Sequence, residues 1–302
     1  MEKEFYSNGK LLLSGEYAIL DGALGLAIPT KQGQSLKVSE LDSEVLKWTS
    51  FDTKKEIWFQ AEFDLKSFGI RTASDEKVAL TLIQLLTEAR NQNPDFLSNH
   101  AGFKVETHLG FPRSWGLGTS STLINNIAEW AQVDAYQLLW NAFGGSGYDI
   151  ACAQHNSPIT YQIQDGIPKV NRVVFSPSFK ESLYFVHLNE KQSSREAIAA
   201  YKEQQFNRVK LIHSISLLTR QMINATSLDG FELVIAQHEA IMSEVLQTPT
   251  IKSRLFPDYS GSIKSLGAWG GDFILATGND QTPDYFKSKG YKTVIAFSEM
   301  LL

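Results

Sequence analysis

Apolar side chains recur with two periods along the first half of the chain, and each period predicts one kind of element. Alternation of apolar and polar residues, clearest over 57–63, predicts strands, and a spacing of three and four residues, clearest over 78–86, predicts helices. We expect Pro29 to end a strand and 41–56 to form a loop or an irregular hairpin. The predicted strands cover 10–13, 24–28, 35–40, 56–63 and 102–107, and the predicted helices cover 75–90, 120–133 and 134–142.

The second half of the chain shows the same two periods. Asp165-Gly166 is a turn-forming pair between two short strands. Thr282 is expected to cap a short helix that carries Pro283 in its first turn. The predicted strands cover 159–163, 172–175, 183–188, 273–277 and 293–297, and the predicted helices cover 194–226, 231–246 and 283–288. The succession predicts a mixed α+β fold, with two domains that meet near residue 180.

Composition narrows the class of protein. The 302 residues are 43% hydrophobic, which is enough for a large core in one or two domains. The net charge of −5 argues against a nucleic-acid partner. The N-terminal residues lack the apolar core of a signal peptide, and no run approaches the ~18 apolar residues of a membrane span. The single cysteine, Cys152, fits a reducing compartment, so we expect a cytoplasmic protein with no membrane partner.

One stretch suggests a site for an anion. Residues 111–122 read Phe-Pro-Arg-Ser-Trp-Gly-Leu-Gly-Thr-Ser-Ser-Thr, a glycine-containing loop that leads into a helical apolar pattern. Glycines allow unusual backbone angles, and the three hydroxyl residues from Thr119 to Ser121 are typical helix caps. The first turn of a helix exposes unpaired amides at the positive end of its dipole, which favours phosphate. An ordinary capped helix remains the alternative interpretation.

Two further glycine turns carry polar residues. Residues 144–151 read Gly-Gly-Ser-Gly-Tyr-Asp-Ile-Ala and place Asp149 at the start of a predicted helix. Asp149 is either a first-turn carboxylate that stabilises the helix or a carboxylate that faces a pocket. Residues 264–277 form a third glycine turn that leads into a strand. The six histidines show no metal-ligand spacing and are interpreted as structural or surface residues.

Taken together, these motifs resemble the GHMP small-molecule kinases, and most closely the phosphomevalonate and mevalonate kinases. Gly9-Lys10-Leu-Leu-Leu-Ser-Gly-Glu-Tyr-Ala18 resembles the first family motif. Residues 112–121 resemble the Pro-x-x-x-Gly-Leu-Gly-Ser-Ser-Ala phosphate loop, and Gly267-Ala-Trp-Gly-Gly-Asp272 resembles the third motif. Gly145-Ser-Gly-Tyr-Asp149-Ile-Ala is similar to a stretch of the phosphomevalonate kinases. The three motifs occur in the family order along the whole chain.

The resemblance implies the GHMP kinase fold. It implies an α+β chain with an ATP-binding domain like domain 2 of ribosomal protein S5 over residues 1–178, and a ferredoxin-like domain over residues 179–302. The cofactors would be ATP and Mg²⁺. The implied catalytic residues are Asp149, near the attacking oxygen, and Lys10, as a positive charge for the transferring group.

The resemblance also implies binding residues. The phosphate loop would hold the nucleotide through Arg113, Gly116, Leu117, Gly118, Thr119, Ser120 and Ser121, with Ser120 as a metal ligand. The acceptor would be held by Glu16, Ser146, Gly147, Ser194, Gly267, Ala268, Trp269 and Gly270.

The chain departs from the family pattern at three places. Leu138 stands where mevalonate kinases carry a metal-binding glutamate, so Mg²⁺ would rely on Ser120 and the phosphates. Thr119 and Ser121 replace the usual serine and alanine of the loop. Trp269 replaces a glycine in the third motif, where an indole could narrow the pocket or stack on a ligand.

These observations support one leading function and two alternatives. The chain is expected to be an ATP-dependent kinase for a small molecule, with phosphomevalonate or mevalonate as the acceptor. The alternatives are a non-catalytic relative that binds a nucleotide or another ligand, and an enzyme like diphosphomevalonate decarboxylase, although Gly118 fits the kinases better. A monomer or a homodimer is expected, and the identity of the acceptor stays open.

Overall fold

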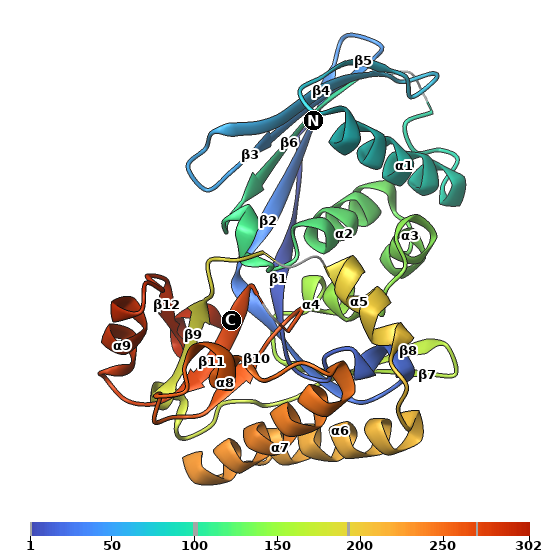
Figure 1. Ribbon diagram of the computed structural model, residues 1–302. Helices are drawn as coiled ribbons and strands as arrows, with labels where there is room; N and C mark the ends of the chain where they lie inside the picture. The colour runs from blue at the N-terminus through green and yellow to red at the C-terminus, as the bar shows by residue number, and fades with distance from the viewer. Residues whose placement is uncertain (1, 99–101, 192–193, 270) are drawn as a thin grey trace. The chain divides into compact units, whose positions relative to one another are not determined.

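The computed structural model describes residues 2–98, 102–191, 194–269 and 271–302 (Figure 1). The strands are β1 (Lys3–Ser14), β2 (Gly25–Leu41), β3 (Val45–Phe51), β4 (Ile57–Asp64), β5 (Ile70–Ala73), β6 (Gly102–Leu109), β7 (Ile159–Gln164), β8 (Ile167–Arg172), β9 (Leu183–His187), β10 (Ile263–Ser265), β11 (Phe273–Thr277) and β12 (Val294–Ala296). The α-helices are α1 (Glu76–Gln92), α2 (Thr119–Ala131), α3 (Ala135–Ala142), α4 (Tyr148–Ala153), α5 (Ser194–Glu203), α6 (Arg208–Ile223), α7 (Leu228–Leu246), α8 (Ile251–Leu255), α9 (Thr282–Ser288) and α10 (Phe297–Met300). The 3-10 turns are η1 (Ala18–Asp21), η2 (Arg113–Trp115) and η3 (Lys180–Ser182).

The strands form two sheets, and the chain divides into two compact units. The larger sheet has the order β5-β4-β3-β6-β2-β7-β8, with β1 paired to β2, and the smaller sheet has the order β10-β11-β9-β12. Unit 1 comprises Met1–Gly9, Gln32–Arg113 and Leu117–Gln154, and unit 2 comprises Lys10–Lys31, Ser114–Gly116 and His155–Leu302. The units therefore alternate along the chain. The expected division between residues 178 and 179 stays a prediction.

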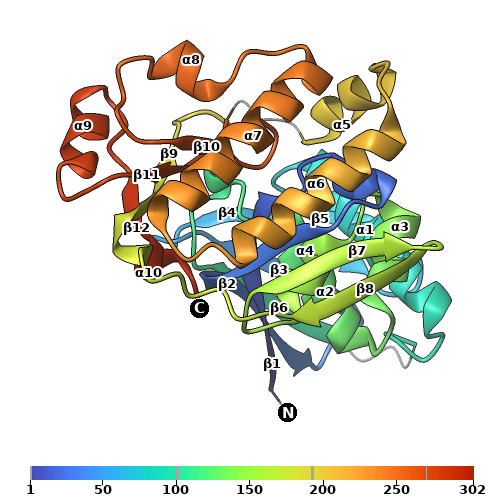
Figure 2. The same cartoon turned by 90° about the horizontal axis from the view of Figure 1, so that it is seen from below.

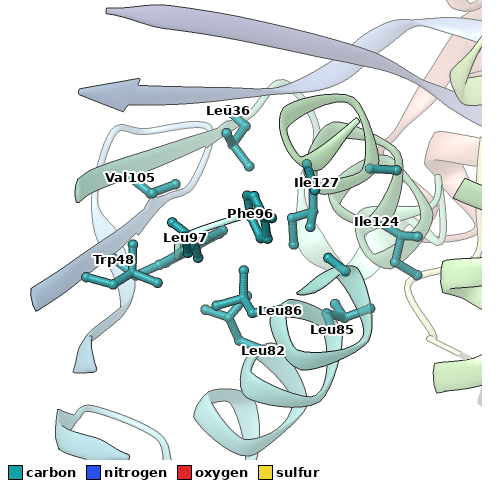
Figure 3. Close-up of a cluster of buried hydrophobic side chains, with 14 of the residues drawn as sticks. Leu36, Trp48, Leu82, Leu85, Leu86, Phe96, Leu97, Val105, Ile124 and Ile127 are labelled. Carbon is teal, nitrogen blue, oxygen red and sulfur yellow. The ribbon is translucent and has the colours of Figure 1, made fainter. Parts of the chain in front are cut away.

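Unit 1 is built around an apolar core between its strands and its helices. Leu36, Trp48 and Val105 on the strands meet leucines of α1 and isoleucines of α2, such as Leu86 and Ile127 (Figure 3). These five side chains are at most 1% exposed. Each large apolar side chain buried in this way contributes roughly 1.5–3 kcal/mol to stability. This core fixes the position of α2, whose first turn carries the predicted phosphate site.

One sequence-based expectation for the larger sheet was confirmed in part, and another was wrong. The stretch 41–56, expected to be a loop or an irregular hairpin, contains β3, which forms a hairpin with β4 whose register shifts between Ser50 and Phe51, and which pairs with β6 on its other side. Its polar Ser50 is tolerated in the core because its hydroxyl accepts hydrogen bonds from Trp48 Nε1 (3.1 Å) and Thr107 Oγ1 (2.9 Å). Pro29 does not end a strand, since β2 runs through it. The pairing of β2 with β7 ends at Ala27, and the pairing of β2 with β6 begins at Gln34. Pro29 therefore lies between the two ladders.

Unit 2 contains the smaller sheet and helices α5 to α10, of which α5 to α8 lie between β9 and β10 in sequence. Helices α6 and α7 lie side by side (Figure 2), and a second apolar core forms around Phe256, Ile274 and Phe286. The expected single helical stretch over 194–226 is two helices. Asn207 caps α6 by accepting a hydrogen bond from Lys210 N (3.0 Å), so the chain breaks between α5 and α6.

Smaller corrections concern the boundaries of elements in unit 2. The Asp165-Gly166 turn is a tight two-residue turn with both φ angles positive, so β8 begins at Ile167 and not at Arg172. Thr282 lies inside α9, and Gln281 takes the cap position. Helix α8 and strand β10 are short elements that the apolar pattern did not reveal. In the described parts of the chain, no helix is both long and apolar enough to span a membrane.

Candidate functional site

The second half of the glycine loop forms the start of α2 in unit 1. Gly118 is the N-cap with φ 96°, a left-handed conformation that favours glycine. The first helical hydrogen bond runs from Thr122 N to Gly118 O (3.0 Å). The amides of Thr119, Ser120 and Ser121 therefore precede the hydrogen-bond ladder of the helix, at the positive end of its dipole. This is the arrangement that binds phosphate at helix N-termini.

The hydroxyl groups of this first turn have different surroundings. Ser121 is 2% exposed and its hydroxyl donates to Gly118 O (3.0 Å). The buried Thr122 hydroxyl donates to Gln34 Oε1 (2.7 Å). Thr119 is half-buried and Ser120 is exposed. Ser120 is therefore the hydroxyl of this turn that is best placed to meet a bound group, whereas Ser121 stabilises the turn itself.

Asp149 lies in the first turn of α4, which packs against α2 within unit 1. Gly147 caps α4 with φ 88°, and the half-buried Asp149 accepts a hydrogen bond from Ile150 N at its Oδ1 (3.1 Å). Gln154 Nε2 donates to Asn125 Oδ1 (2.9 Å) and joins the two helices. Two of the predicted motifs thus meet in one unit, each at the N-terminus of a helix.

The other loop residues of unit 1 are held by packing. The guanidinium of Arg113 is 3.8 Å from the ring centroid of Trp58, an arrangement that attracts a cation to an aromatic face. Arg113 is exposed, so its charge remains accessible. Leu117 is fully buried, so its side chain belongs to the core and only its backbone could meet a ligand.

In unit 2 the first half of the loop packs on the third glycine motif. Lys10 Nζ donates to Gly116 O (2.7 Å), which places an ammonium group on the loop. A Cβ built at Gly116 would lie 2.5 Å from Asp272 Oδ2, and one built at Gly267 would lie 3.3 Å from the same atom. A side chain at residue 116 would therefore require this carboxylate to move. The structure therefore joins the predicted first, second and third motifs around Asp272.

Aromatic contacts hold this half of the loop on the smaller sheet. Trp115 meets Phe273 edge to face, with ring centroids 5.5 Å apart. His187 Nε2 lies 3.2 Å from Ser114 O. His187 was expected to be a structural or surface histidine, and its 6% exposure and this contact give it a structural position beside the loop.

Glu16 belongs to a cluster of buried charges in unit 2. Lys264 Nζ lies 2.7 Å from Glu16 Oε1 and 3.3 Å from Glu239 Oε1, and His238 Nε2 lies 3.3 Å from Glu16 Oε2. Burial raises the pKa of Glu16 and raises the pKa of Glu239 to about 7, although Lys264 opposes both shifts. Burial also holds the pKa of His238 well below its ordinary value, so this imidazole is neutral. Glu16, expected to bind the acceptor, is here the fully buried partner of a lysine.

The remaining predicted acceptor residues are placed as follows. Ser146 is 6% exposed and Gly147 is the α4 cap, while Ala268 and Trp269 line a cavity in unit 2. Ser194 begins α5, but its side chain and all of Gly270 lie outside the described residues. The sequence interpretation missed Lys264 and Glu239 as partners of Glu16. The place of Lys264 at the start of the third glycine motif was the one signal that could have pointed to this cluster.

No metal centre is built from clustered protein ligands in the described parts of the chain. They contain no group of three or more His, Cys, Asp or Glu side chains placed to hold a metal ion. Leu138, at the position where the resemblance would place a metal-binding glutamate, is fully buried in the core of unit 1. A metal at this site would depend on hydroxyl and phosphate oxygens, which suit Mg²⁺.

Comparison with known proteins shows the fold. No family model matches the chain, and no curated protein matches it in sequence. Among solved structures, Methanococcus jannaschii mevalonate kinase matches with a TM-score of 0.68 and 14% identity over 97% of this chain and 96% of that one. Streptococcus pneumoniae phosphomevalonate kinase in complex with phosphomevalonate and AMPPNP matches with a TM-score of 0.68 and 17% identity over 95% of each chain. Lactococcus lactis galactokinase complexed with galactose matches with a TM-score of 0.65 and 13% identity over 96% of this chain and 89% of that one.

These three structures are kinases of the GHMP type, and the likeness covers nearly the whole chain. The protein therefore has the GHMP kinase fold, with a large mixed sheet and a separate small antiparallel sheet. The α+β class and the fold expected from the three glycine motifs are confirmed.

Proposed function

We propose that the protein is an ATP-dependent kinase that transfers the γ-phosphoryl group to a small molecule. The observation that carries the proposal is the Gly118-capped start of α2, where the amides from Thr119 to Ser121 precede the helical ladder. In a chain with this fold, that turn supports a site for the ATP phosphates. The exposed hydroxyl of Ser120 is the protein oxygen that would accompany the phosphates as a ligand of Mg²⁺.

The chemistry would be carried by two residues with different tasks. The Asp149 carboxylate, half-buried at the start of α4, would orient the attacking hydroxyl or phosphate oxygen and accept its proton. Lys10 would stabilise the charge that develops on the transferring group, and its ammonium is already held at the carbonyl of Gly116. Arg113 would add a second cation to the nucleotide side. Positioning and charge stabilisation supply most of the rate enhancement in phosphoryl transfer.

For the acceptor, we propose phosphomevalonate or mevalonate first. The motif resemblance favours these acceptors, and structures of this fold include a phosphomevalonate kinase with phosphomevalonate bound. We further propose that the protein acts in the cytoplasm, as a monomer or a homodimer.

A second candidate function is the binding of a nucleotide or another ligand without turnover. It is favoured by Trp269, which is 3% exposed and stands where the family motif has a glycine. The kinase is favoured by Asp149 in the first turn of α4 in unit 1 and by Lys10, whose ammonium donates to Gly116 O in unit 2, because the resemblance gives both residues catalytic roles.

Asp149→Asn separates the two functions. This variant keeps the size of the side chain and an oxygen that can accept the hydrogen bond from Ile150 N, but removes the charge. A kinase loses about 10²–10⁴-fold in kcat, because a general base is lost, while its Kd for ATP changes little. The exposed Asp42→Asn is the matched control and keeps full turnover. Acceptor-dependent turnover that survives in Asp149→Asn would contradict the proposed role of Asp149.

A further inference from the structure

Helices α6 and α7 of unit 2 form a helical hairpin with an exposed face. Residues 224–227 connect Ile223 at the end of α6 to Leu228 at the start of α7, and the two helices pack side by side (Figure 2). They therefore run antiparallel. Buried side chains such as Ile215 and Ile235 belong to the interior of unit 2, whereas the side chains on the opposite face of both helices are exposed.

Apolar side chains recur on this exposed face. On α6, Val209 is 78% exposed and Leu217 is 46% exposed, and on α7, Leu233 is 65% exposed. The exposed Ala236 and Ala240 follow Leu233 at helical spacing, so they share its side of α7. Single exposed apolar residues are common, but five on one two-helix face form a patch that is typical of a binding surface.

The charges of the hairpin are separated between its two helices. Helix α6 contains arginine and lysine but no aspartate or glutamate, whereas α7 contains aspartate and glutamate but no arginine or lysine. Four exposed side chains of these sets form no ion pair with the described residues: Lys210, Arg220, Asp229 and Glu244. A face that is basic on one helix and acidic on the other is complementary to a second face with the two helices exchanged.

A two-fold axis parallel to the helices exchanges them in this way. It places α6 of one copy against α7 of the other, so a basic helix meets an acidic helix twice. The apolar residues then stand at matching levels. Leu217 lies six residues before the end of α6 (223 − 217), and Leu233 lies five residues after the start of α7 (233 − 228). Leu217 of one copy therefore comes opposite Leu233 of the other.

The same axis brings opposite charges together. Lys210 lies 13 residues before the end of α6 (223 − 210), and Glu244 lies 16 residues after the start of α7 (244 − 228). This offset of three residues is about 4.5 Å along the helix, which the two long side chains can span. Arg220 and Asp229 come together at the other end of the hairpin. An axis perpendicular to the helices would instead place α6 against α6 and bring like charges together.

The size of the face suits a reversible dimer. Helix α7 has 19 residues and is about 28 Å long, and two packed helices present a face about 20 Å wide. Such a face buries about 1,100 Å² over both copies, which is just above the size that a specific interface needs. We propose that the exposed face of the α6–α7 hairpin binds a second copy of this chain, with α6 of each copy against α7 of the other. A nucleic acid or an anionic membrane fits this face less well, because acidic α7 repels it.

Analytical ultracentrifugation of the full chain tests the proposal first and needs no ATP or acceptor. The concentration is raised from about 1 µM to about 300 µM, because an interface of this size is expected to dissociate in the micromolar range. The average mass is expected to rise from 33.8 kDa towards twice that value. A mass that stays at 33.8 kDa over the whole range overturns the proposal.

Two charge reversals then identify the surface. Lys210→Glu and Glu244→Lys are each expected to weaken the dimer at least about tenfold, because like charges then meet twice. Each new charge suits the dipole at its own helix end, so neither variant is expected to lose stability. The exposed Lys169→Glu on β8 is the matched control and keeps wild-type association. A Lys210→Glu variant that associates as tightly as this control overturns the assignment to the hairpin.

A mixture of the two charge variants tests the arrangement of the helices. Lys210→Glu and Glu244→Lys in equal amounts are expected to form a heterodimer about as tight as the wild-type dimer, since both contacts again join opposite charges. A mixture that associates no better than either variant alone overturns the pairing of α6 with α7.

A pair of alanine substitutions tests the apolar part of the face. Leu217→Ala is expected to weaken the dimer about tenfold, because both copies lose an apolar contact at the centre of the face. Ile167→Ala on β8 is the matched control, since Ile167 is 57% exposed and lies away from the hairpin in sequence and in its sheet. Equal effects of the two substitutions overturn the assignment to this face.

Discussion

The carboxylate of Asp272 occupies the space that a side chain at residue 116 would need. A Cβ built at Gly116 would lie 2.5 Å from Asp272 Oδ2, and Gly116 has a φ of 65°. Gly116 and Asp272, 156 residues apart in sequence (272 − 116), thus approach each other at a distance that a side chain at residue 116 would obstruct unless the carboxylate moved. The same glycine carries the carbonyl that accepts a hydrogen bond from Lys10.

Gly116→Ala is expected to destabilise the protein more than backbone strain alone predicts. The added methyl group collides with Asp272, and such overpacking costs roughly 1–3 kcal/mol beyond the strain of a positive φ. Gly166→Ala is the matched control, because Gly166 has a φ of 76° and nothing within 4 Å of its built Cβ. The free energies of unfolding of the two variants in urea give the comparison. Equal losses would show that the close approach of Asp272 is unimportant.

Ser120 and Ser121 are expected to have separate roles. Ser121→Ala removes a buried hydroxyl bonded to Gly118 O, so it lowers the free energy of unfolding by about 1 kcal/mol. Ser120→Ala changes an exposed residue, so it leaves stability unchanged and raises the Mg²⁺ concentration needed for half-maximal turnover. Thermal unfolding and Mg²⁺ titrations of both variants provide the measurement. The opposite assignment of effects would refute the proposed metal role of Ser120.

Lys264→Met is expected to be among the most destabilising single substitutions in unit 2. It leaves the buried carboxylates of Glu16 and Glu239 without their common cation, and such a loss costs about 3–5 kcal/mol. Lys66→Met removes the exposed partner of Glu44, at 3.1 Å, and is expected to change stability little. Chemical denaturation of both variants measures the contrast. Similar small losses would mean that the buried cluster is not held by Lys264.

The stability of the protein is expected to depend on pH through Glu239. Burial raises the pKa of Glu239 to about 7, whereas its unfolded value is 4.5. Between these values the folded state holds a proton that the unfolded state has released. The contribution of Glu239 is therefore largest below pH 4.5 and decreases as the pH rises to 7. The contribution of His238 to stability has the opposite pH dependence. Because this imidazole stays neutral in the folded state, its contribution decreases as the pH falls below 6.5.

Glu239→Gln isolates the carboxyl from this opposing histidine. Glu16, Lys264, Ser265 and His238 face the same cluster in both proteins. The free energy of unfolding of the variant, relative to the wild type, is expected to rise from pH 5 to pH 8 by up to about 3 kcal/mol. Urea denaturation at each pH gives this difference. A difference that does not change with pH would contradict the raised pKa.

The parts of the fold that depend on local sequence could be predicted. Helix α2 begins within one residue of the expected start, because glycine and hydroxyl residues precede a helical apolar pattern. The same pattern did not show that Gly118, and not a hydroxyl residue, takes the cap position. The stretch that holds β3 was expected only as a loop or an irregular hairpin, because its partners β4 and β6 supply the pairing and polar Ser50 obscures the apolar period.

In the candidate site, the helix-terminal positions of Asp149 and of the α2 turn could also be predicted, because they depend on local sequence. Asp149 and the α2 turn are local features, and both lie at helix N-termini as expected. The pairing of Glu16 with Lys264 joins residues 248 positions apart, so no local period reveals it. The cavity between Tyr17, Tyr201 and Trp269 also depends on the tertiary fold, which brings distant segments of unit 2 together.

The most direct test of the kinase proposal is acceptor-dependent release of ADP from Mg²⁺-ATP by the wild-type protein. The acceptors are mevalonate, 5-phosphomevalonate, 5-diphosphomevalonate, homoserine and galactose, and calorimetry measures ATP binding in parallel. We expect ATP to bind, and one acceptor, first 5-phosphomevalonate or mevalonate, to give ADP and a phosphorylated product in equal amounts. Absence of ATP binding together with absence of ADP release for every acceptor would contradict the proposed function.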